Sequence, residues 1–495
     1  MINVVIIFWV LLNLLLAFFV IHEVGLLFAA LTKLKRVNPE KFNREVFPNV
    51  LIQLPVYNEK YVIGDLIDSV LKINYPSEKL TIQILDDSTD ETTAIIKEHL
   101  KKLSPLVIKV EHVRRTERIG YKAGALDHGL QLNHSDFIAV FDADFRPKPD
   151  FLLKTIPFFE DEKVGVVQTR WGHMNESQSI LTRAQTIMLD AHFGVEQLGR
   201  SASGGFINFN GTAGVWRRAC IEDAGGWHAD TLTEDLDLSF RAQAKHWKFQ
   251  FLRHVVSPAE LPTSYGAFRN QQFRWSKGAA ECFRKNIHML WKSPVSFHAK
   301  IIGTFHLLNS SVYMLVLLLT TLAPLVFFLS ESGQLKGFEW LPILGTSINL
   351  MLLIVFLGGK LICADFKWKT VLWFIPSLFF FFSMSIGIAL HMVMGVLEGY
   401  RGKKTPFIRT PKFGSNLAEK QLFQKSYKQN ARYNLKVFEV IFFIYGLFWF
   451  YMGISNLNAF VLVYSLILIT GYSLALFGDL PIKSSRTELR TSISN

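Results

Sequence analysis

The sequence is poor in cysteine, with only Cys220, Cys282 and Cys363 among its 495 residues. These three match neither the spacing of a zinc site nor a disulfide framework, and they suit a protein whose soluble part lies in a reducing compartment. Signatures of zinc fingers, RNA-binding domains and basic zippers are also missing. The net charge of +12 does not indicate nucleic acid, because much of the basic excess flanks apolar segments, where it sets membrane topology and contacts anionic lipid. We therefore expect no nucleic-acid partner.

The sequence also lacks a glycine-rich phosphate loop of the Walker or dinucleotide-binding type. Such loops hold phosphates with backbone N–H groups. A phosphate-bearing ligand of this protein would therefore have to be held by a metal ion and by cationic side chains.

Apolar residues, in contrast, make up 50% of the chain and gather in long runs. Runs near 20 residues can span the hydrocarbon core of a bilayer. The runs cover residues 3–32, 301–329, 341–358, 371–397, 437–454 and 458–477. Residues 48–290 are charged and mixed, and they have the size of a soluble domain. We predict an integral membrane protein that carries one large soluble domain.

Basic residues beside the apolar runs predict the orientation. The first run lacks a positively charged start and a small-residue cleavage site, so we interpret residues 1–35 as a retained anchor and not as a signal peptide. It is followed by Lys33, Lys35, Arg36, Lys41 and Arg44. By the positive-inside rule these residues place the soluble domain in the cytoplasm, and ten lysines and arginines between residues 401 and 436 place that segment there too.

Three spans between Trp275 and Arg401 would put the second basic segment outside, so one of the three apolar runs there should lie in the interface or re-enter. We assign this role to residues 371–398, although an interfacial helix normally has a clearer polar face. The expected spans are residues 5–30, 308–330, 341–359, 437–454 and 458–477. The domain plan is an anchor at 1–35, a cytoplasmic domain at 45–290, interface and transmembrane helices at 291–398, a cytoplasmic loop at 399–436, two transmembrane helices at 437–480 and a cytoplasmic tail at 481–495.

The soluble segment alternates strand-like and helix-like patterns. Four apolar segments predict strands, at residues 50–56, 80–85, 107–110 and 137–141. The stretches between them are able to form helices, so the order predicts an α/β, Rossmann-like domain with a mostly parallel sheet. In such sheets, ligands bind beyond the carboxyl ends of the strands.

Polar side chains follow three of the predicted strands. They are Tyr57-Asn58-Glu59, Asp86-Asp87-Ser88-Thr89-Asp90 and Asp142-Ala143-Asp144. One of them alone would be an ordinary turn or helix cap, but three that face one crevice are typical of a nucleotide site. Because side chains alternate along a strand, Asp142 and Asp144 would lie on one side if the extended conformation persists. Their oxygens suit Mg²⁺ or Mn²⁺ shared with a diphosphate.

Three further segments carry candidate features, each with a plainer structural alternative. Lys122 begins a helix-like segment between the third and fourth strands, or it is a solvated surface lysine. Thr233 precedes Glu234 and Asp235, which either form the acidic first turn of a capped helix or provide a general base. The small-residue turn at 208–214 suits a close approach of the backbone to a substrate, although glycine turns have many causes.

Gln271, Arg274 and Trp275 lie three and four positions apart, which places them on one face of a predicted helix. The plain interpretation is a buried tryptophan beside an arginine that reaches the surface. The functional interpretation is a tryptophan that stacks on a sugar ring while the arginine holds a phosphate.

Together these motifs resemble glycosyltransferase family 2, in its processive, membrane-embedded branch of cellulose, chitin and mannan synthases. The resemblance covers residues 50–290 and continues more loosely to about residue 415. Segments 85–90, 120–126, 141–145, 192–197 and 209–217 are most similar to the cellulose-synthase-like A group, the glucomannan 4-β-mannosyltransferases, and to bacterial relatives. Four motifs occur in family order: the Asp pair at Asp87, Asp142-Ala143-Asp144, Thr233-Glu234-Asp235, and the Gln-x-x-Arg-Trp of Gln271, Arg274 and Trp275.

The resemblance implies a GT-A-type fold and a role for each candidate residue. Asp142 and Asp144 would hold Mg²⁺ or Mn²⁺ on the diphosphate, and Asp235 would be the base on the acceptor hydroxyl. The residues implied in substrate binding are Asp87 at the nucleoside, Lys122 and Arg274 at the phosphates, Trp275 beneath the acceptor sugar, and Glu234 and Gln271 within the same motifs.

The implied reaction is a single in-line displacement, because one base without a second carboxylate nucleophile suits inversion. An α-linked donor such as GDP-mannose, UDP-glucose or GDP-glucose should then give a β-linked glycan. We expect a mannan, glucomannan or glucan, β-1,4-linked and passed across the plasma or inner membrane, or the Golgi membrane in a eukaryote. Accessory export proteins are compatible with this role.

Two alternatives differ in product and in class. A non-processive transferase would add one hexose to a lipid acceptor. A transporter with a regulatory domain is disfavoured, because the sequence shows no internal repeat and few charges within the spans.

Residues 407–412 are similar to the family's gating loop, Phe-x-Val-Thr-x-Lys, which covers the bound donor. The sequence departs from that pattern at Arg409, which stands at the valine position. A basic juxtamembrane loop is the alternative interpretation.

Overall fold

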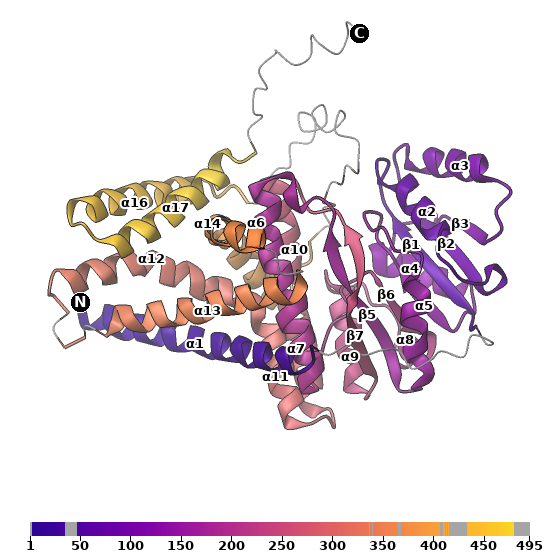
Figure 1. Cartoon of the computed structure of the whole chain (residues 1–495), viewed down its shortest axis with the longest axis horizontal. Helices are drawn as coiled ribbons and strands as arrows, with labels where there is room; N and C mark the ends of the chain where they lie inside the picture. Colours follow the sequence, from indigo (N-terminus) through magenta and orange to yellow (C-terminus); the bar gives the residue numbers. More distant parts are fainter. Residues whose placement is uncertain are drawn as a thin grey trace, which may run out of the picture.

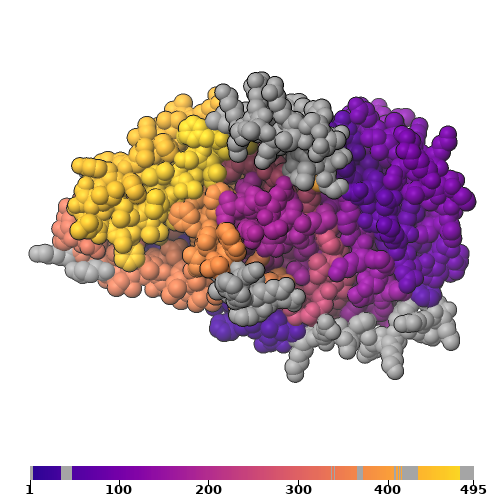
Figure 2. All heavy atoms as spheres, turned by 45° about the horizontal axis from the view of Figure 1, so that its top comes forward, coloured from indigo at the N-terminus to yellow at the C-terminus, as the bar shows by residue number. Residues whose placement is uncertain are grey.

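The structure is a computed structural model that describes residues 2–34, 47–335, 337–338, 340–364, 368–405, 409–410, 412, 414 and 433–479. A sheet with its flanking helices forms one end of the molecule, and long apolar helices form the other (Figure 1). Figure 2 shows the same division on the surface, with the yellow and orange C-terminal helices at one end and the purple residues of the first half of the sheet at the other.

The sheet has seven strands in the order β3-β2-β1-β4-β6-β5-β7. Strands β1 to β4 are mutually parallel, β6 is antiparallel to both of its neighbours, and β5 is parallel to β7. The mostly parallel sheet and the four predicted strands are confirmed, although β3 begins two residues later than expected. The bounds are β1 (Val50–Val56), β2 (Leu80–Asp86), β3 (Lys109–Val113), β4 (Phe137–Val140), β5 (Val164–His173), β6 (Gly214–Arg217) and β7 (Lys248–Ala259).

Both faces of the sheet are covered, which explains the continuous apolar runs of its strands. In β1, Ile52 and Leu54 contribute to one core and Leu51 to the core on the opposite face. Gln53 is also fully buried, and its Nε2 donates a hydrogen bond to the backbone oxygen of Leu126 at 3.1 Å. The fold therefore satisfies the amide nitrogen of this buried side chain, whereas Gln53 Oε1 has no hydrogen-bond partner among the described residues.

The helices of the soluble part surround the sheet, and α6 and α10 lie between it and the apolar helices (Figure 1). The α-helices are α2 (Ile63–Leu71), α3 (Thr92–Leu103), α4 (Tyr121–Gln131), α5 (Phe151–Thr155), α6 (Ile180–Ala191), α7 (Leu198–Ser203), α8 (Arg218–Asp223), α9 (Glu234–Ala244) and α10 (Tyr265–Lys292). A π-helical segment, η4 (His192–Gln197), joins α6 to α7. Short 3₁₀ segments are η1 (Ser77–Lys79), η2 (Ile156–Glu160), η3 (Glu176–Gln178) and η5 (Asn309–Ser311).

Six helical stretches within the described residues are long and apolar enough to cross a membrane. They are Val4–Thr32, Phe297–Glu331, Leu341–Cys363, Leu372–Arg401, Lys436–Ser455 and Ala459–Phe477. Each of the five predicted spans coincides with or falls within one of these stretches, to within a residue. The helices that form them are α1 (Ile2–Thr32), α11 (Phe297–Leu308), α12 (Val312–Glu331), α13 (Leu341–Cys363), α14 (Trp368–Arg401), α16 (Lys436–Ser455) and α17 (Ala459–Phe477).

Helix α14 differs in direction from the other apolar helices. Helices α1, α12, α13, α16 and α17 lie lengthwise in Figure 1, whereas the labelled part of α14 is seen nearly end on beside α6. It packs against α6, α10, α12 and α17. This arrangement supports an interfacial helix at residues 371–398, although its length and composition would also allow a span. The assignment stays a prediction.

Several sequence predictions fall on residues that the structure does not describe. They concern Lys35, Arg36, Lys41 and Arg44 after the anchor, most of the loop at 399–436, and the tail at 481–495. Lys33 is described, and its Nζ donates hydrogen bonds to the backbone oxygen and Oγ of Ser201 at 3.1 and 3.0 Å. This contact joins the end of α1 to α7 of the soluble domain.

A cysteine at Lys403, whose side chain is 62% exposed, should react with an impermeant thiol reagent from the cytoplasmic side only, because the segment around it is basic. Val107→Cys, at a position 85% exposed in the soluble domain, is the matched control. Both variants would be labelled in intact cells and in inverted vesicles, in a protein without its three native cysteines. Labelling of residue 403 from outside alone would contradict the proposed topology.

Candidate active site

A cavity of about 680 Å³ lies beyond the carboxyl ends of β1, β2 and β4. Each of the three polar segments that follow these strands contributes to its wall, through Tyr57 and Glu59, through Asp87, and through Asp142 and Asp144, as expected at the carboxyl edge of a parallel sheet. All nine predicted site residues line it, namely Asp87, Lys122, Asp142, Asp144, Glu234, Asp235, Gln271, Arg274 and Trp275. The structure therefore brings together side chains that are spread over almost 190 positions of the sequence.

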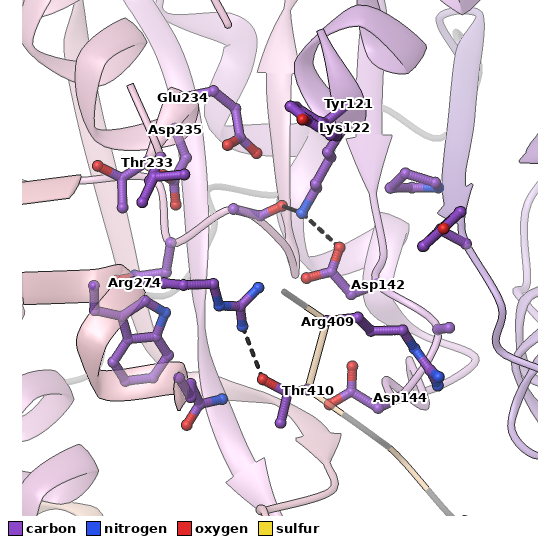
Figure 3. A pocket seen from close by; sticks show the side chains of 18 of the residues that line it. Tyr121, Lys122, Asp142, Asp144, Thr233, Glu234, Asp235, Arg274, Arg409 and Thr410 are labelled. Carbon is purple, nitrogen blue, oxygen red and sulfur yellow. Dashed lines mark hydrogen bonds and ion pairs between the residues drawn. The ribbon is translucent and has the colours of Figure 1, made fainter. Parts of the chain in front are cut away.

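Asp142 and Asp144 follow β4, which ends at Val140, and they lie in a turn. The extended conformation does not persist to Asp144, but both carboxylates still line the cavity (Figure 3). Asp142 Oδ1 lies 2.5 Å from Lys122 Nζ, and Asp144 Oδ2 lies 2.6 Å from Lys412 Nζ. Burial raises the pKa of Asp142; the charge of Asp144 adds to this shift, and Lys122 opposes it. The pair thus forms a negative site that attracts cations.

Lys122 lies in the first turn of α4, and its ammonium group also donates a hydrogen bond to the backbone oxygen of Gly211 at 2.8 Å. Gly211 has φ +77°, and a Cβ there would lie 3.0 Å from Asp235 Oδ2 and 3.5 Å from Lys122 Nζ. A side chain at position 211 would be strained, and its Cβ would crowd the Asp235 carboxylate. The predicted small-residue turn therefore keeps the space between Lys122 and Asp235 open.

Glu234 and Asp235 begin α9, and Thr233 occupies the cap position. Thr233 therefore stands at the N-cap position, as one interpretation of the sequence expected, but its side chain makes no capping hydrogen bond. Its hydroxyl instead contacts Cys282 Sγ at 3.4 Å. Burial and then the charge of Glu234 raise the pKa of Asp235 to about 7, and Lys122 opposes this shift. A carboxyl group that titrates near neutrality is suited to accept a proton from a substrate.

Gln271, Arg274 and Trp275 project from α10 into the cavity. One terminal nitrogen of Arg274 donates a hydrogen bond to Thr410 Oγ1 at 2.9 Å (Figure 3). Burial lowers the pKa of Arg274 to about 10, although the charges of Asp142 and Glu234 oppose it, so the guanidinium group stays protonated at neutral pH. The structure places this arginine within the cavity, not in the surface position that the plain interpretation allowed.

Trp275 lies beside a second tryptophan, with its ring centroid 6.3 Å from that of Trp171. Trp171 lies near the end of β5 and also lines the cavity. Two large aromatic faces in a cavity that also contains charged groups are typical of sugar-binding surfaces, because the C–H faces of a sugar pack on aromatic rings while its hydroxyls bind polar groups.

Asp87 is held by Arg115, whose Nε donates to Asp87 Oδ1 at 3.0 Å and whose terminal nitrogen donates to Oδ2. Close by, the Arg118 guanidinium lies 3.4 Å from the ring centroid of Tyr57. Sequence reasoning missed both arginines as site residues. Their position just after β3, beside the carboxyl end of β2, was the available signal.

Residues 409, 410 and 412 of the segment similar to the gating loop contribute side chains to the same cavity, whereas Phe407, Ile408 and Pro411 lie outside the described residues. Arg409 donates two hydrogen bonds to Glu59, at 2.8 and 2.6 Å, and Lys412 Nζ also donates to the backbone oxygen of Glu260 at 2.7 Å. Burial raises the pKa of Glu59 to about 7, and Arg409 opposes this shift. Arg409, which stands where the family pattern has valine, thus has an ion-pair partner within the site, Glu59.

Residues 48–278 match the model of a family described as "Glycosyltransferase like family 2". This domain belongs to glycosyltransferase family 2. The predicted family and the GT-A-type α/β fold are thereby confirmed.

The proteins to which this chain is similar include plant enzymes. Over 328 residues it is 38% identical to "Glucomannan 4-beta-mannosyltransferase 2" of Arabidopsis thaliana, covering 63% of this chain and 60% of the relative. Over 251 residues it is 42% identical to "Probable glucomannan 4-beta-mannosyltransferase 7" of Oryza sativa subsp. japonica, covering 50% of this chain and 43% of the relative. The matched part of the chain thus spans between 43% and 60% of the length of these relatives.

A solved structure with a similar arrangement is "Mannosyltransferase PcManGT from Pyrobaculum calidifontis in complex with GDP-Man and Mn2+". Its TM-score is 0.47 and its sequence identity is 18%, and the match covers 79% of this chain and all of the other.

The family 2 domain has a second acidic cluster outside the predicted metal site, formed by His228, Asp230 and Asp237. The ammonium group of Lys285 lies 2.7 Å from Asp230 Oδ1, 3.1 Å from Asp237 Oδ1 and 3.2 Å from His228 Nδ1. Arg241 pairs with Asp237 as well, at 2.9 Å. We interpret the cluster as an ion-pair network that joins α9 to α10, because basic side chains already balance its charge.

Removal of either partner of the Arg409–Glu59 pair should leave a largely buried charge unpaired, and each side chain is 14% exposed. We expect Arg409→Met and Glu59→Gln to be coupled by more than about 1 kcal/mol in a double-mutant cycle of donor binding. The matched control is the exposed pair Lys102–Glu98, for which the cycle should give about 0.5 kcal/mol or less. Equal coupling energies in the two cycles would show that the Arg409–Glu59 pair makes no specific contribution to donor binding.

Proposed function

We propose that this protein is an inverting, processive membrane glycosyltransferase that polymerises hexose units from a nucleotide sugar into a β-linked glycan. The product is a β-1,4 mannan, glucomannan or glucan, which passes through the apolar helices. The carrying observation is that one cavity contains the acidic pair Asp142 and Asp144, the candidate base Asp235 and the aromatic platform Trp275. The family 2 domain and the names of the plant relatives support the same conclusion.

The acidic pair fits a divalent cation. Both carboxylates line the cavity. In this structure Asp142 pairs with Lys122 and Asp144 with Lys412, so a bound cation would replace these lysines, whose ammonium groups would then be free to contact donor phosphates. Carboxylate oxygens suit Mg²⁺ or Mn²⁺, which bind through one or two carboxylates and substrate phosphates. When bound, such a cation offsets the charge of the departing diphosphate, which contributes on the order of several kcal/mol.

Other residues of the cavity would hold the nucleotide-sugar donor beside the cation. Lys122 and Arg274 approach the cavity from α4 and α10 and would neutralise phosphate oxygens, which suits a fold without a glycine-rich phosphate loop. Asp87, fixed by Arg115 at the end of β2, would bind the nucleoside. Glu234 and Gln271 line the space between these groups and would bind sugar hydroxyls.

Asp235 would take the proton from the acceptor hydroxyl. Its carboxyl group has a raised pKa because it is buried beside Glu234, so it can be ionised above neutral pH and still bind a proton firmly. A single displacement at the anomeric carbon inverts its configuration, and an α-linked donor then yields a β-linked product.

The acceptor would lie on Trp275 and Trp171, towards α6 and α10. These helices lie between the sheet and the apolar helices (Figure 1), so a chain that grows at the cavity is delivered beside the candidate membrane helices. We expect the protein in the plasma or inner membrane, or in the Golgi membrane of a eukaryote, with the catalytic domain in the cytoplasm.

The donor can be identified with purified protein. GDP-mannose, UDP-glucose and GDP-glucose would each be supplied with Mg²⁺ or Mn²⁺, and the size and linkage of the product determined. The proposal predicts an insoluble or high-molecular-weight β-1,4 polymer from at least one donor. A product that is only an organic-soluble glycolipid would favour single transfer to a lipid, and no turnover of any donor would reject the proposal.

A further inference from the structure

A buried chain of charged groups connects the end of α13 to the wall of the cavity. Lys360, in the last turn of α13, places its Nζ 3.0 Å from Asp190 Oδ2 and 2.7 Å from Glu176 Oε1. The other oxygen of Asp190, Oδ1, lies 3.4 Å from His173 Nε2. The side chains of Lys360, Asp190 and His173 are 9%, 5% and 6% exposed. The reaction proposed above assigns no role to these four side chains.

Of these four charged or polar side chains, His173 is the one that lines the cavity. It is the last residue of β5 and stands two positions after Trp171, so both side chains project from the same face of the strand. Leu189 of α6 and Leu261 and Pro262, which precede α10, line the cavity with it. This part of the wall therefore adjoins α6 and α10, which pack against the apolar helices α13 and α14.

The geometry fixes which nitrogen of His173 is available to a ligand. Asp190 accepts a hydrogen bond from Nε2, which leaves Nδ1 as the acceptor in a neutral imidazole. Within the described part of the chain, Nδ1 has no hydrogen-bond partner and is not among the fully buried polar atoms. Burial opposes ionisation of Asp190, but the hydrogen bond with His173 and the charge of Lys360 lower its pKa, so Asp190 stays a carboxylate.

We propose that His173 is an acceptor-binding residue, whose Nδ1 receives a hydrogen bond from a hydroxyl of the glycan that packs on Trp171 and Trp275. The inference rests on the proposed function and extends it to the specificity of the acceptor end. Asp190 and Lys360 act through His173, and we assign them a positioning role. A β-linked hexan suits this wall, because its C–H ring faces are largely apolar and most of its hydroxyls are equatorial and project from the ring edges.

The inference also gives Lys360 a function beyond packing. Lys360 belongs to a helix that is long and apolar enough to span a membrane, whereas His173 belongs to the sheet. Their link through Asp190 fixes the acceptor end of the cavity relative to α13. The position of the glycan would thereby be matched to the helices through which it leaves.

The direct test is the affinity of the purified protein for β-1,4-linked hexose oligosaccharides, measured by the fluorescence of its tryptophans. His173→Phe retains a ring and removes the acceptor nitrogen, and we expect it to weaken oligosaccharide binding about three- to tenfold, the range of one lost hydrogen bond. His173→Asn, whose amide oxygen can replace Nδ1, should recover part of the affinity. Lys360→Met should weaken binding in the same direction as His173→Phe, and donor KM should not change in any of these variants.

The matched control is His99→Asn, because His99 forms a similar pair with Asp68 at 2.8 Å but lies on α3, outside the cavity wall. It should leave the affinity unchanged. A purely structural role predicts that His173→Phe lowers the unfolding temperature and leaves affinity unchanged, which would overturn the inference while the proposed function stands. Failure of the unaltered protein to bind any glycan or to turn over any donor would instead reject the proposed function together with the inference.

Discussion

Asp235→Asn should reduce turnover by about 10²- to 10⁴-fold, the usual contribution of a positioned general base. The amide keeps the shape of the side chain but cannot take a proton from the acceptor hydroxyl. Affinity for the nucleotide donor should stay within about twofold, because the proposed donor contacts come from other residues. Initial rates with excess donor and acceptor, together with donor affinity by calorimetry, measure the two effects separately.

The pH dependence provides a second test of the same role. Because the pKa of Asp235 is raised to about 7, kcat/KM should fall about tenfold for each pH unit below 7 and level off above it. Asp223→Asn is the matched control, because Asp223 lies on α8 outside the cavity wall and pairs with Lys245. It should keep the rate and the pH profile. A flat profile for the unaltered protein between pH 5 and 8 would contradict the assignment of Asp235 as the base.

Misfolding can be separated from loss of the base, because Asp235→Asn should not destabilise the protein at pH 8. The folded-state pKa of Asp235 lies above the unfolded value of about 4. The folded state therefore binds this proton more strongly, and its stability falls as pH rises between about 4 and 7. The asparagine variant lacks this loss, so its Tm at pH 8 should equal or exceed that of the parent protein.

Asp142→Asn should remove most of the metal-dependent activity, with a loss on the order of 10³-fold if the cation contributes several kcal/mol. The substitution removes one of two carboxylates and replaces the charged partner of Lys122, at 2.5 Å, by a neutral amide. Binding of Mn²⁺, measured by its paramagnetic resonance signal in the presence of donor, should weaken in parallel. A chelator should inactivate the unaltered protein, and Mn²⁺ or Mg²⁺ should restore it.

The matched control for the metal site is Asp150→Asn, an acidic residue eight positions further on whose side chain is 45% exposed and pairs with Lys154. It should change neither metal binding nor turnover. Full activity of the Asp142→Asn variant, or turnover that persists after the chelator, would show that these carboxylates do not serve a donor-bound cation.

Much of the sheet could be predicted from the sequence, because strands that are buried on both faces consist mainly of apolar residues and form short apolar runs in the sequence. Residues 50–56 and 80–85 show this clearly, since β1 and β2 occupy almost the same positions. Asp142 and Asp144 could be found for a related reason. Charged side chains directly after a buried parallel strand lie at the edge where ligands bind.

Contacts between distant segments could not be predicted in this way. Arg409 and Glu59 are 350 positions apart, and Lys360 and Asp190 are 170 positions apart. Periodicity describes only the local face of each element, so it contains no information on which distant charge completes a pair. The same limit applies to α14, whose composition is that of a membrane span while its direction depends on packing against α6, α10 and α17.

The central claim is a single displacement on a cation-bound nucleotide sugar by a hydroxyl that Asp235 deprotonates. The most direct test is the anomeric configuration of the first bond formed, determined by NMR after one turnover of an α-linked donor in the presence of Mn²⁺. The account predicts a β-linkage and no product after removal of the metal ion. An α-linkage would require a second displacement or a different nucleophile, and it would contradict the account.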